Sequence, residues 1–190
     1  MSEDDKYKWV EYHKWKLSTS WYIETAPKLV LATRVKFGFL GFYNPDIGVT
    51  PFQRFYLGGD GLSGYNNLDG REIIGMRGYI NESITPLYYK NKNIGGNVYS
   101  KYTLELRYPL SLNPSATIYA LTFIEAGNSW LGFDTFNPFE VYRSAGAGVR
   151  VFLPMFGLLG LDWGYGFDEV PGIPNANGSQ FHFSINQSID

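Results

Sequence analysis

The stretch YSKYTLELRYPL, residues 99–110, alternates apolar and polar side chains along its length. Successive side chains of a β-strand point to opposite faces, so this alternation predicts a strand with one apolar and one charged face. The apolar face has an aromatic residue at each end and consists of Tyr102, Leu104, Leu106 and Tyr108. The charged face consists of Lys101, Thr103, Glu105 and Arg107.

The same alternation recurs along the chain and predicts an all-β, antiparallel fold. Seven strands are expected, at residues 9–24, 28–43, 97–112, 116–128, 142–154, 158–168 and 180–189. They approach or exceed the roughly 9–11 residues that a tilted strand needs to cross a membrane, whereas ordinary strands average about five or six residues. One strand is ambiguous, because its apolar Tyr119, Leu121 and Phe123 share a face with Glu125.

Two architectures bury one face of alternating strands. A soluble sandwich places the apolar face in its core, and a transmembrane barrel places that face in lipid, with aromatic residues at both interfaces. Strand length and the aromatic ends of the apolar faces favour the barrel. Glycines on the expected inner face also favour it, because they allow another segment to pack closely there. These glycines are Gly146, Gly148, Gly160, Gly164 and Gly166.

Seven strands do not close into a bacterial barrel of the usual kind. Such barrels have an even number of strands, at least eight, and open edges in lipid would leave backbone groups unpaired. We therefore expect the chain to be the C-terminal part of a larger barrel.

Composition excludes several classes of function. The net charge of −2 gives no field that would attract nucleic acid, and the absence of cysteine excludes disulfides and thiolate metal sites. No nucleophile–base–acid set appears, so we expect no enzymatic activity and no cofactor or metal site. The first 14 residues, MSEDDKYKWVEYHK, are too polar for a signal peptide, so an exported protein would need residues upstream of them.

A second informative stretch is FYLGGDGLSGYNNLDGREIIGMRGY, residues 55–79, in which seven of 25 residues are glycine. It lies in the long connection at about 44–96, between the second and third expected strands. By itself the stretch is compatible with an exposed loop, in which Arg77 would be an ordinary surface arginine. It is also compatible with a folded insertion inside a barrel.

Several motifs, in order, resemble BamA, the outer-membrane protein assembly factor of the bacterial surface antigen family, in its Bacteroidetes form. They are GMRGY, YTLELRYPL, FIEAGNSW, SAGAGVRVFLPMFGLLGLDWGYGFD and the terminal FHFSINQSI. The resemblance implies a sixteen-stranded barrel preceded by periplasmic POTRA repeats. The chain would supply its last seven strands, with the connection at about 44–96 folded inward as a loop.

The resemblance also implies the site residues. The loop motif would be Gly75, Met76, Arg77, Gly78 and Tyr79, and the acidic partners of Arg77 inside the barrel would be Glu105 and Glu125. The last strand would form a weak lateral seam with the first strand through the segment that carries Phe181, Phe183, Ile185 and Ile189. Family members commonly end on an aromatic residue, whereas Ile189 stands at that position here.

The implied function is the insertion of β-barrel proteins into the bacterial outer membrane. The partners would be unfolded outer-membrane protein clients, outer-membrane lipid and the accessory lipoproteins of the BAM complex, which would bind through the POTRA repeats. A TamA-like or two-partner secretion barrel shares the arginine motif and stays an alternative. A passive porin and a soluble carbohydrate-binding sandwich are the other two.

Overall fold

The computed structural model describes residues 11–44, 48–50, 52–60, 71–89, 92–155 and 157–185. Seven long strands form one antiparallel sheet in the order β1-β2-β7-β8-β9-β10-β11. They are β1 (Tyr12–Ala26), β2 (Leu29–Phe42), β7 (Val98–Asn113), β8 (Ala116–Trp130), β9 (Tyr142–Leu153), β10 (Gly157–Gly166) and β11 (Gly178–Ile185). The prediction of an all-β antiparallel sheet with seven barrel strands is confirmed. No helix in the described ranges is long and apolar enough to span a membrane.

The strands lie within a few residues of the positions that the alternation predicts. The ends expected at 9–10 and 186–189 fall outside the described residues. Short connections join β1 to β2, β7 to β8 and β9 to β10, and they all lie at one end of the sheet because consecutive strands pair antiparallel. The longer connections, at 43–97, 131–141 and 167–177, therefore share the opposite end, which we call the loop end.

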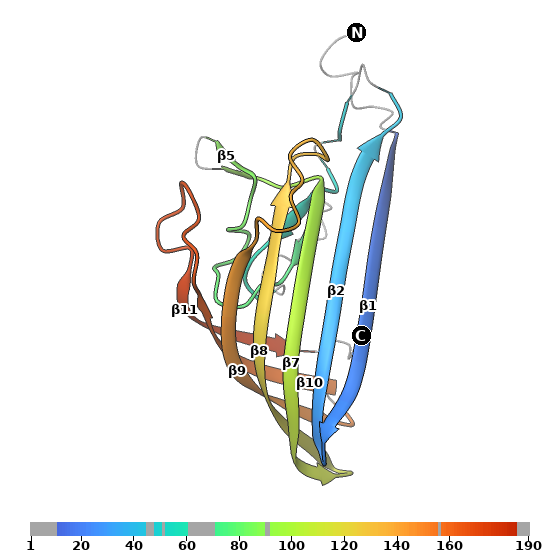
Figure 1. Ribbon diagram of the computed structural model, residues 1–190, viewed down its shortest axis with the longest axis vertical. Coiled ribbons are helices and arrows are strands. Elements are labelled where there is room, and N and C mark those ends of the chain that lie inside the picture. Colours follow the sequence, from blue (N-terminus) through green and yellow to red (C-terminus); the bar gives the residue numbers. More distant parts are fainter. Residues whose placement is uncertain are drawn as a thin grey trace.

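The sheet is strongly curved. Figure 1 shows β1, β2 and β7 upright, while β10 and β11 run across behind them. On the convex face, apolar side chains such as Leu104, Leu161 and Phe181 are 41%, 57% and 74% exposed. On the concave face, polar side chains such as Glu125 and Asp162 are buried. This inverted distribution is what a barrel wall with lipid outside requires.

The ambiguous strand β8 has a simple explanation in the structure. Glu125 faces inward, so Leu121 and Phe123 on the same face also point inward, where both are 3% exposed. The long connection between β2 and β7 covers Phe123, because the Arg77 guanidinium lies over its ring.

That connection supplies the hydrophobic core on the concave side. It contains four short strands: β3 (Phe55–Leu57), β4 (Glu72–Ile74), β5 (Leu87–Tyr89) and β6 (Lys92–Ile94). The strands β3 and β4 pair in parallel, and β5 and β6 pair antiparallel. The core joins these segments to the wall and consists of Leu40, Phe55, Leu57, Ile74, Met76, Tyr79, Ile84, Tyr99, Val170 and Ala176.

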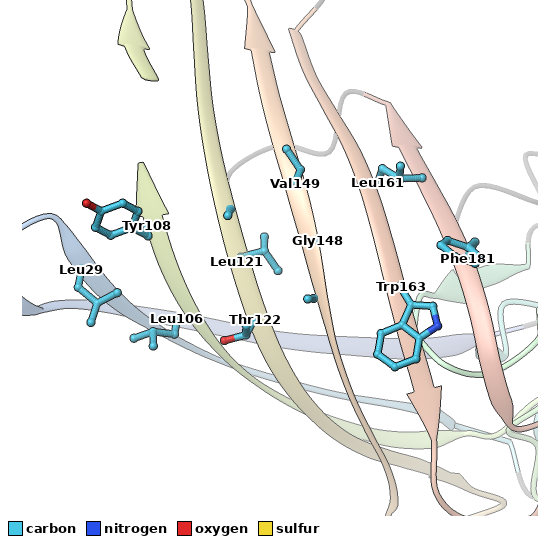
Figure 2. Close-up of a pocket in the computed structure, with 12 residues that line it drawn as sticks. Leu29, Leu106, Tyr108, Leu121, Thr122, Gly148, Val149, Leu161, Trp163 and Phe181 are labelled. Carbon is cyan, nitrogen blue, oxygen red and sulfur yellow. The ribbon is translucent and has the colours of Figure 1, made fainter. Parts of the chain in front are cut away.

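The convex face is hollowed near its middle by an apolar groove of about 530 Å³. Small side chains on β8 and β9, Ala120, Thr122 and Ala147, lie between larger ones on the flanking strands. Figure 2 shows two of these larger side chains, Tyr108 on β7 and Trp163 on β10. The groove thus follows from residue size across neighbouring strands, and its lining has the apolar character of the whole face.

Candidate functional site

The GMRGY motif, residues 75–79, follows β4 and lies against the concave wall. The Met76 N–H donates to the Gly59 carbonyl at 2.8 Å, which fixes the strand-like entry to the motif, and the Met76 side chain is fully buried. The Gly75 carbonyl accepts a hydrogen bond from the Lys101 ammonium on β7 at 2.5 Å. The motif is therefore held at its beginning by both the loop and the wall.

Arg77 is 8% exposed and contacts three carboxylates of the wall. Its Nη2 donates to Glu105 on β7 and to Glu125 on β8, each at 2.8 Å. Its Nη1 lies 3.4 Å from Asp162 Oδ2 on β10. The Arg77 backbone N–H also donates to Glu125, at 2.9 Å. Arg77 thus joins the loop to three strands at once.

The guanidinium of Arg77 also lies over an aromatic ring. Its central carbon is 3.5 Å from the centroid of the Phe123 ring, a close cation–π contact. Burial by itself lowers the pKa of the Arg77 guanidinium, but the charges of Glu125, Glu105 and Asp162 outweigh burial, so the pKa lies above its ordinary value. Arg77 therefore stays charged in this buried place.

Each of the three carboxylates also has a cation of its own on the wall. The pairs are Arg107–Glu105 at 2.6 Å, Lys101–Glu125 at 2.9 Å and Arg150–Asp162 at 2.7 Å. We call these six residues together with Arg77 the Arg77 network. The wall is already neutral within these three pairs, so Arg77 brings one positive charge that the three carboxylates share.

Gly78 fits against the wall through its backbone. Its φ of +86° is a left-handed conformation that favours glycine. A Cβ at Gly78 would lie 2.6 Å from the Gly166 nitrogen, and one at Gly164 would lie 2.7 Å from the Gly78 nitrogen. Two of the five inward glycines of the wall, Gly164 and Gly166, thus make room for the loop.

The other three inward glycines make room for side chains of the wall itself. A Cβ at Gly146 would meet the Phe123 ring, one at Gly148 would meet the Asp162 carboxylate, and one at Gly160 would meet Ser184 and Arg150. These glycines serve the Arg77 network indirectly, because they give its buried side chains space.

The motif also reaches the last strand. The Gly78 N–H donates to His182 Nε2 on β11 at 2.9 Å. The Tyr79 hydroxyl donates to the Arg143 carbonyl at 2.8 Å and accepts from the Asp168 N–H at 3.3 Å. Burial raises the pKa of this hydroxyl to about 12. The motif residues thus contact β7, β8, β9, β10 and β11.

Sequence reasoning named Arg77, Glu105 and Glu125, and the structure brings these three together. It missed Asp162 and His182. Both occupy inward-facing positions of strands that the alternation predicts. The alternation could therefore have identified them as candidate site residues. It could not have shown which inward residues lie at the height of Arg77, because that depends on how neighbouring strands are staggered.

The expected seam residues lie on the convex face of β11. Phe181, Phe183 and Ile185 are 74%, 50% and 46% exposed, and Ile189 falls outside the described residues. Within the described strands, β11 pairs with β10 alone and β1 with β2 alone. The two outer strands of the sheet each present an edge.

Comparisons with known proteins agree with this architecture. A family model described as the Omp85 superfamily domain matches residues 6–189. The crystal structure of BamA from Haemophilus ducreyi lacking POTRA domains 1–3 is similar, with a TM-score of 0.63 and 20% sequence identity. The match covers 91% of this chain and 34% of that chain, so this chain spans about a third of the length of the solved structure. A comparison with curated proteins finds no match.

Proposed function

Because the chain belongs to the Omp85 superfamily, we propose that it is the C-terminal part of a BamA-like barrel, which inserts and assembles β-barrel proteins in the bacterial outer membrane. The activity involves no bond chemistry and no cofactor. The clients are unfolded outer-membrane proteins, and accessory lipoproteins of the BAM complex bind through POTRA repeats outside this chain. We extend the proposal to a Bacteroidetes source on the sequence resemblance alone.

The observation that carries this proposal is the docking of the GMRGY motif on the concave wall. An insertion held by one arginine to three strands keeps the wall in a defined curvature, because charge-assisted hydrogen bonds fix direction as well as distance. We propose that the connection at about 44–96 is the inward-folded loop of the barrel and that Arg77 is its main attachment. A passive porin predicts instead open ion conductance and indifference to substitution of Arg77.

The last strand is the proposed place of insertion. The outward row of β11 is apolar, and its free edge presents backbone groups that a client strand can pair with, as in β-augmentation. In the complete barrel this edge meets the first strand through few hydrogen bonds. The seam then opens at a low cost compared with any other strand pair of the sheet.

The proposal is tested by replacing Arg77 with alanine in the full-length protein of the source bacterium. Loss of Arg77 frees the loop from the wall, so the amounts of folded outer-membrane proteins should fall severalfold. Two nearby arginines provide controls. Arg71 pairs with Glu82 at 2.9 Å within the connection, and Arg54 donates to backbone carbonyls there.

Quantitative blotting of several barrel proteins in purified outer membranes is the measurement. Arg71→Ala and Arg54→Ala should reduce their amounts much less than Arg77→Ala does. Equal losses in all three variants would contradict a special role for Arg77.

A further inference from the structure

The connection 131–140, between β8 and β9, folds back over the convex face of the sheet, and we call it the 131–140 flap. The Phe133 ring lies edge-on to the Phe39 ring, with 5.2 Å between centroids. The Phe136 ring lies edge-on to the Phe37 ring, at 5.8 Å. Phe37 and Phe39 occupy outward positions of β2, so the flap covers the face that carries the exposed apolar side chains. Its orange trace lies beside the loop ends of β7 and β8 in Figure 1.

Beneath the flap lie outward positions that would otherwise face the surroundings of the barrel. Trp130 packs edge-on against Phe136 at 4.8 Å and is 5% exposed. Ser100 and Asn128 are 1% and 9% exposed, and the Asn128 amide donates to the Glu140 carbonyl at 2.7 Å. The flap therefore covers Trp130 and binds the Asn128 side chain on the convex face.

The free surface of the flap carries large apolar side chains beside the exposed polar Asp134, Thr135, Asn137 and Glu140. Leu131, Phe133 and Phe139 are 39%, 59% and 91% exposed. The backbone that carries Phe139 is held in a turn, because the Phe139 N–H donates to Asn137 Oδ1 at 3.1 Å and the Glu140 N–H donates to the Asn137 carbonyl at 3.1 Å. The Phe139 side chain is therefore almost fully exposed on a turn whose backbone is held by hydrogen bonds.

We propose that the 131–140 flap is a membrane anchor that lies in the boundary between headgroups and acyl chains of the outer leaflet, with Phe139 inserted among the lipids. This inference rests on the outer-membrane location proposed above. A phenyl ring so exposed is unfavourable in water and favourable at an apolar boundary. The flap continues the lipid-facing surface of the strands, and it lies at the loop end, where barrels place an aromatic belt.

The hydrogen bond between Asn128 and the flap fits the same role. An uncovered amide on the lipid side would lose its hydrogen bonds to water on insertion. The flap gives the Asn128 amide a carbonyl partner, whereas the buried Ser100 hydroxyl has no hydrogen-bond partner among the described residues. The flap therefore extends the apolar band of the barrel toward the loop end at β7 and β8.

The test measures the surroundings of residue 139 directly. The chain contains no cysteine, so a single cysteine can carry a nitroxide spin label once any cysteine elsewhere in the full-length protein is replaced. Phe139→Cys is labelled in the protein reconstituted in phospholipid vesicles. Collision rates are measured with oxygen, which concentrates in lipid, and with a water-soluble nickel chelate.

Two control positions define the scale. Leu161→Cys lies on the convex face of β10 and reports lipid, whereas Glu169→Cys lies in the exposed loop after β10 and reports water. We expect the oxygen-to-nickel ratio at 139 to exceed that at 169 severalfold and to approach that at 161. A ratio at 139 equal to that at 169 would overturn the anchor. Shielding of 139 from both reagents would overturn it in favour of a protein partner.

The control at 161 separates this inference from the proposed function. If the label at 161 also reports water, the membrane location itself is wrong. If 161 reports lipid and 139 reports water, only the flap proposal fails.

Discussion

Arg77 is the one residue of its network that comes from the loop. Each carboxylate that it contacts is already paired with a cation of the wall: Arg107, Lys101 or Arg150. Removing Arg77 therefore leaves three paired carboxylates, whereas removing a wall carboxylate leaves buried cations without a counter-charge. Breaking a buried pair from one side is strongly destabilising because the remaining charge has lost its water.

Because of this difference in charge balance, two substitutions in the Arg77 network should have different effects on the stability of the barrel wall. Asp162→Asn should lower the stability of the full-length barrel by about 3–5 kcal/mol, because Arg150 and Arg77 both lose a charged partner. Arg77→Ala should detach the loop yet leave the barrel wall folded. The measurement is the temperature at which the folded band disappears in semi-native electrophoresis.

A matched control for the buried aspartate is Asp168→Asn. Asp168 pairs with Arg143 at 2.7 Å near the loop end, where the Arg143 side chain is 63% exposed. A solvent-exposed pair contributes little, so this variant should unfold near the wild-type temperature. If Asp162→Asn behaves like Asp168→Asn, the Arg77 network is not a stabilising element of the wall.

At the scale of elements, the motif connects strands that are distant in the sheet. Arg77 contacts β7, β8 and β10, and the neighbouring Gly78 N–H contacts His182 on β11. His182 pairs in register with Asp162, so the last strand and the network meet at one height of the wall. A shift of β11 along β10 would remove the imidazole from Gly78. The position of the last strand is thus linked to the seating of the loop.

Gly78→Ala is expected to disrupt this contact between elements. The added Cβ would lie 2.6 Å from the Gly166 nitrogen and 2.7 Å from the Tyr165 carbonyl carbon, both of them backbone atoms that cannot move aside cheaply. The loop should therefore leave the wall and become sensitive to added protease in intact cells. Appearance of a cleavage product within residues 44–96 is the measurement.

Gly178→Ala separates the clash from the conformational strain. Gly178 also has a positive φ, +106°, but a Cβ there has nothing within 4 Å. Both variants carry the strain of an alanine at positive φ, which costs about 1–3 kcal/mol. Protease sensitivity in Gly78→Ala alone would assign the effect to packing against β10, and equal sensitivity in both would contradict that assignment.

At the scale of the whole molecule, the chain presents two outer strands and an apolar convex face. Unpaired strand edges are unfavourable in lipid because no water is present to satisfy their backbone groups. The solved structure that the chain resembles is about three times as long, since the match covers 34% of it. We therefore expect the cellular protein to contain further strands that pair with β1 and β11.

The size of the native protein checks this expectation. An antibody raised against residues 141–167 should detect, in purified outer membranes, a band several times heavier than the 21.6 kDa of this chain. A band at 21.6 kDa in that fraction would mean that the sheet closes by association of several copies. A band in the soluble fraction would contradict the membrane location.

The sequence by itself determined the strands and their two faces. Alternation is a local property, because each side chain of a strand points opposite to its neighbour whatever the rest of the fold does. It therefore placed Leu104 outward and Glu105 inward without knowledge of the partners of either strand. The ambiguous face of β8 shows the limit: Phe123 is apolar and inward, and Arg77 from a distant segment of the chain lies over its ring.

Only the tertiary structure decided which inward and outward residues meet. The stagger of β10 against β8 brings Asp162 to Arg77, the stagger of β11 brings His182 to Gly78, and the return of the 131–140 flap brings Phe136 onto Phe37. None of these contacts leaves a periodic trace in the sequence, because each joins residues far apart in the chain through the curvature of the sheet. The physical reason is that pattern fixes the direction of a side chain, while register and curvature fix its height and its neighbours.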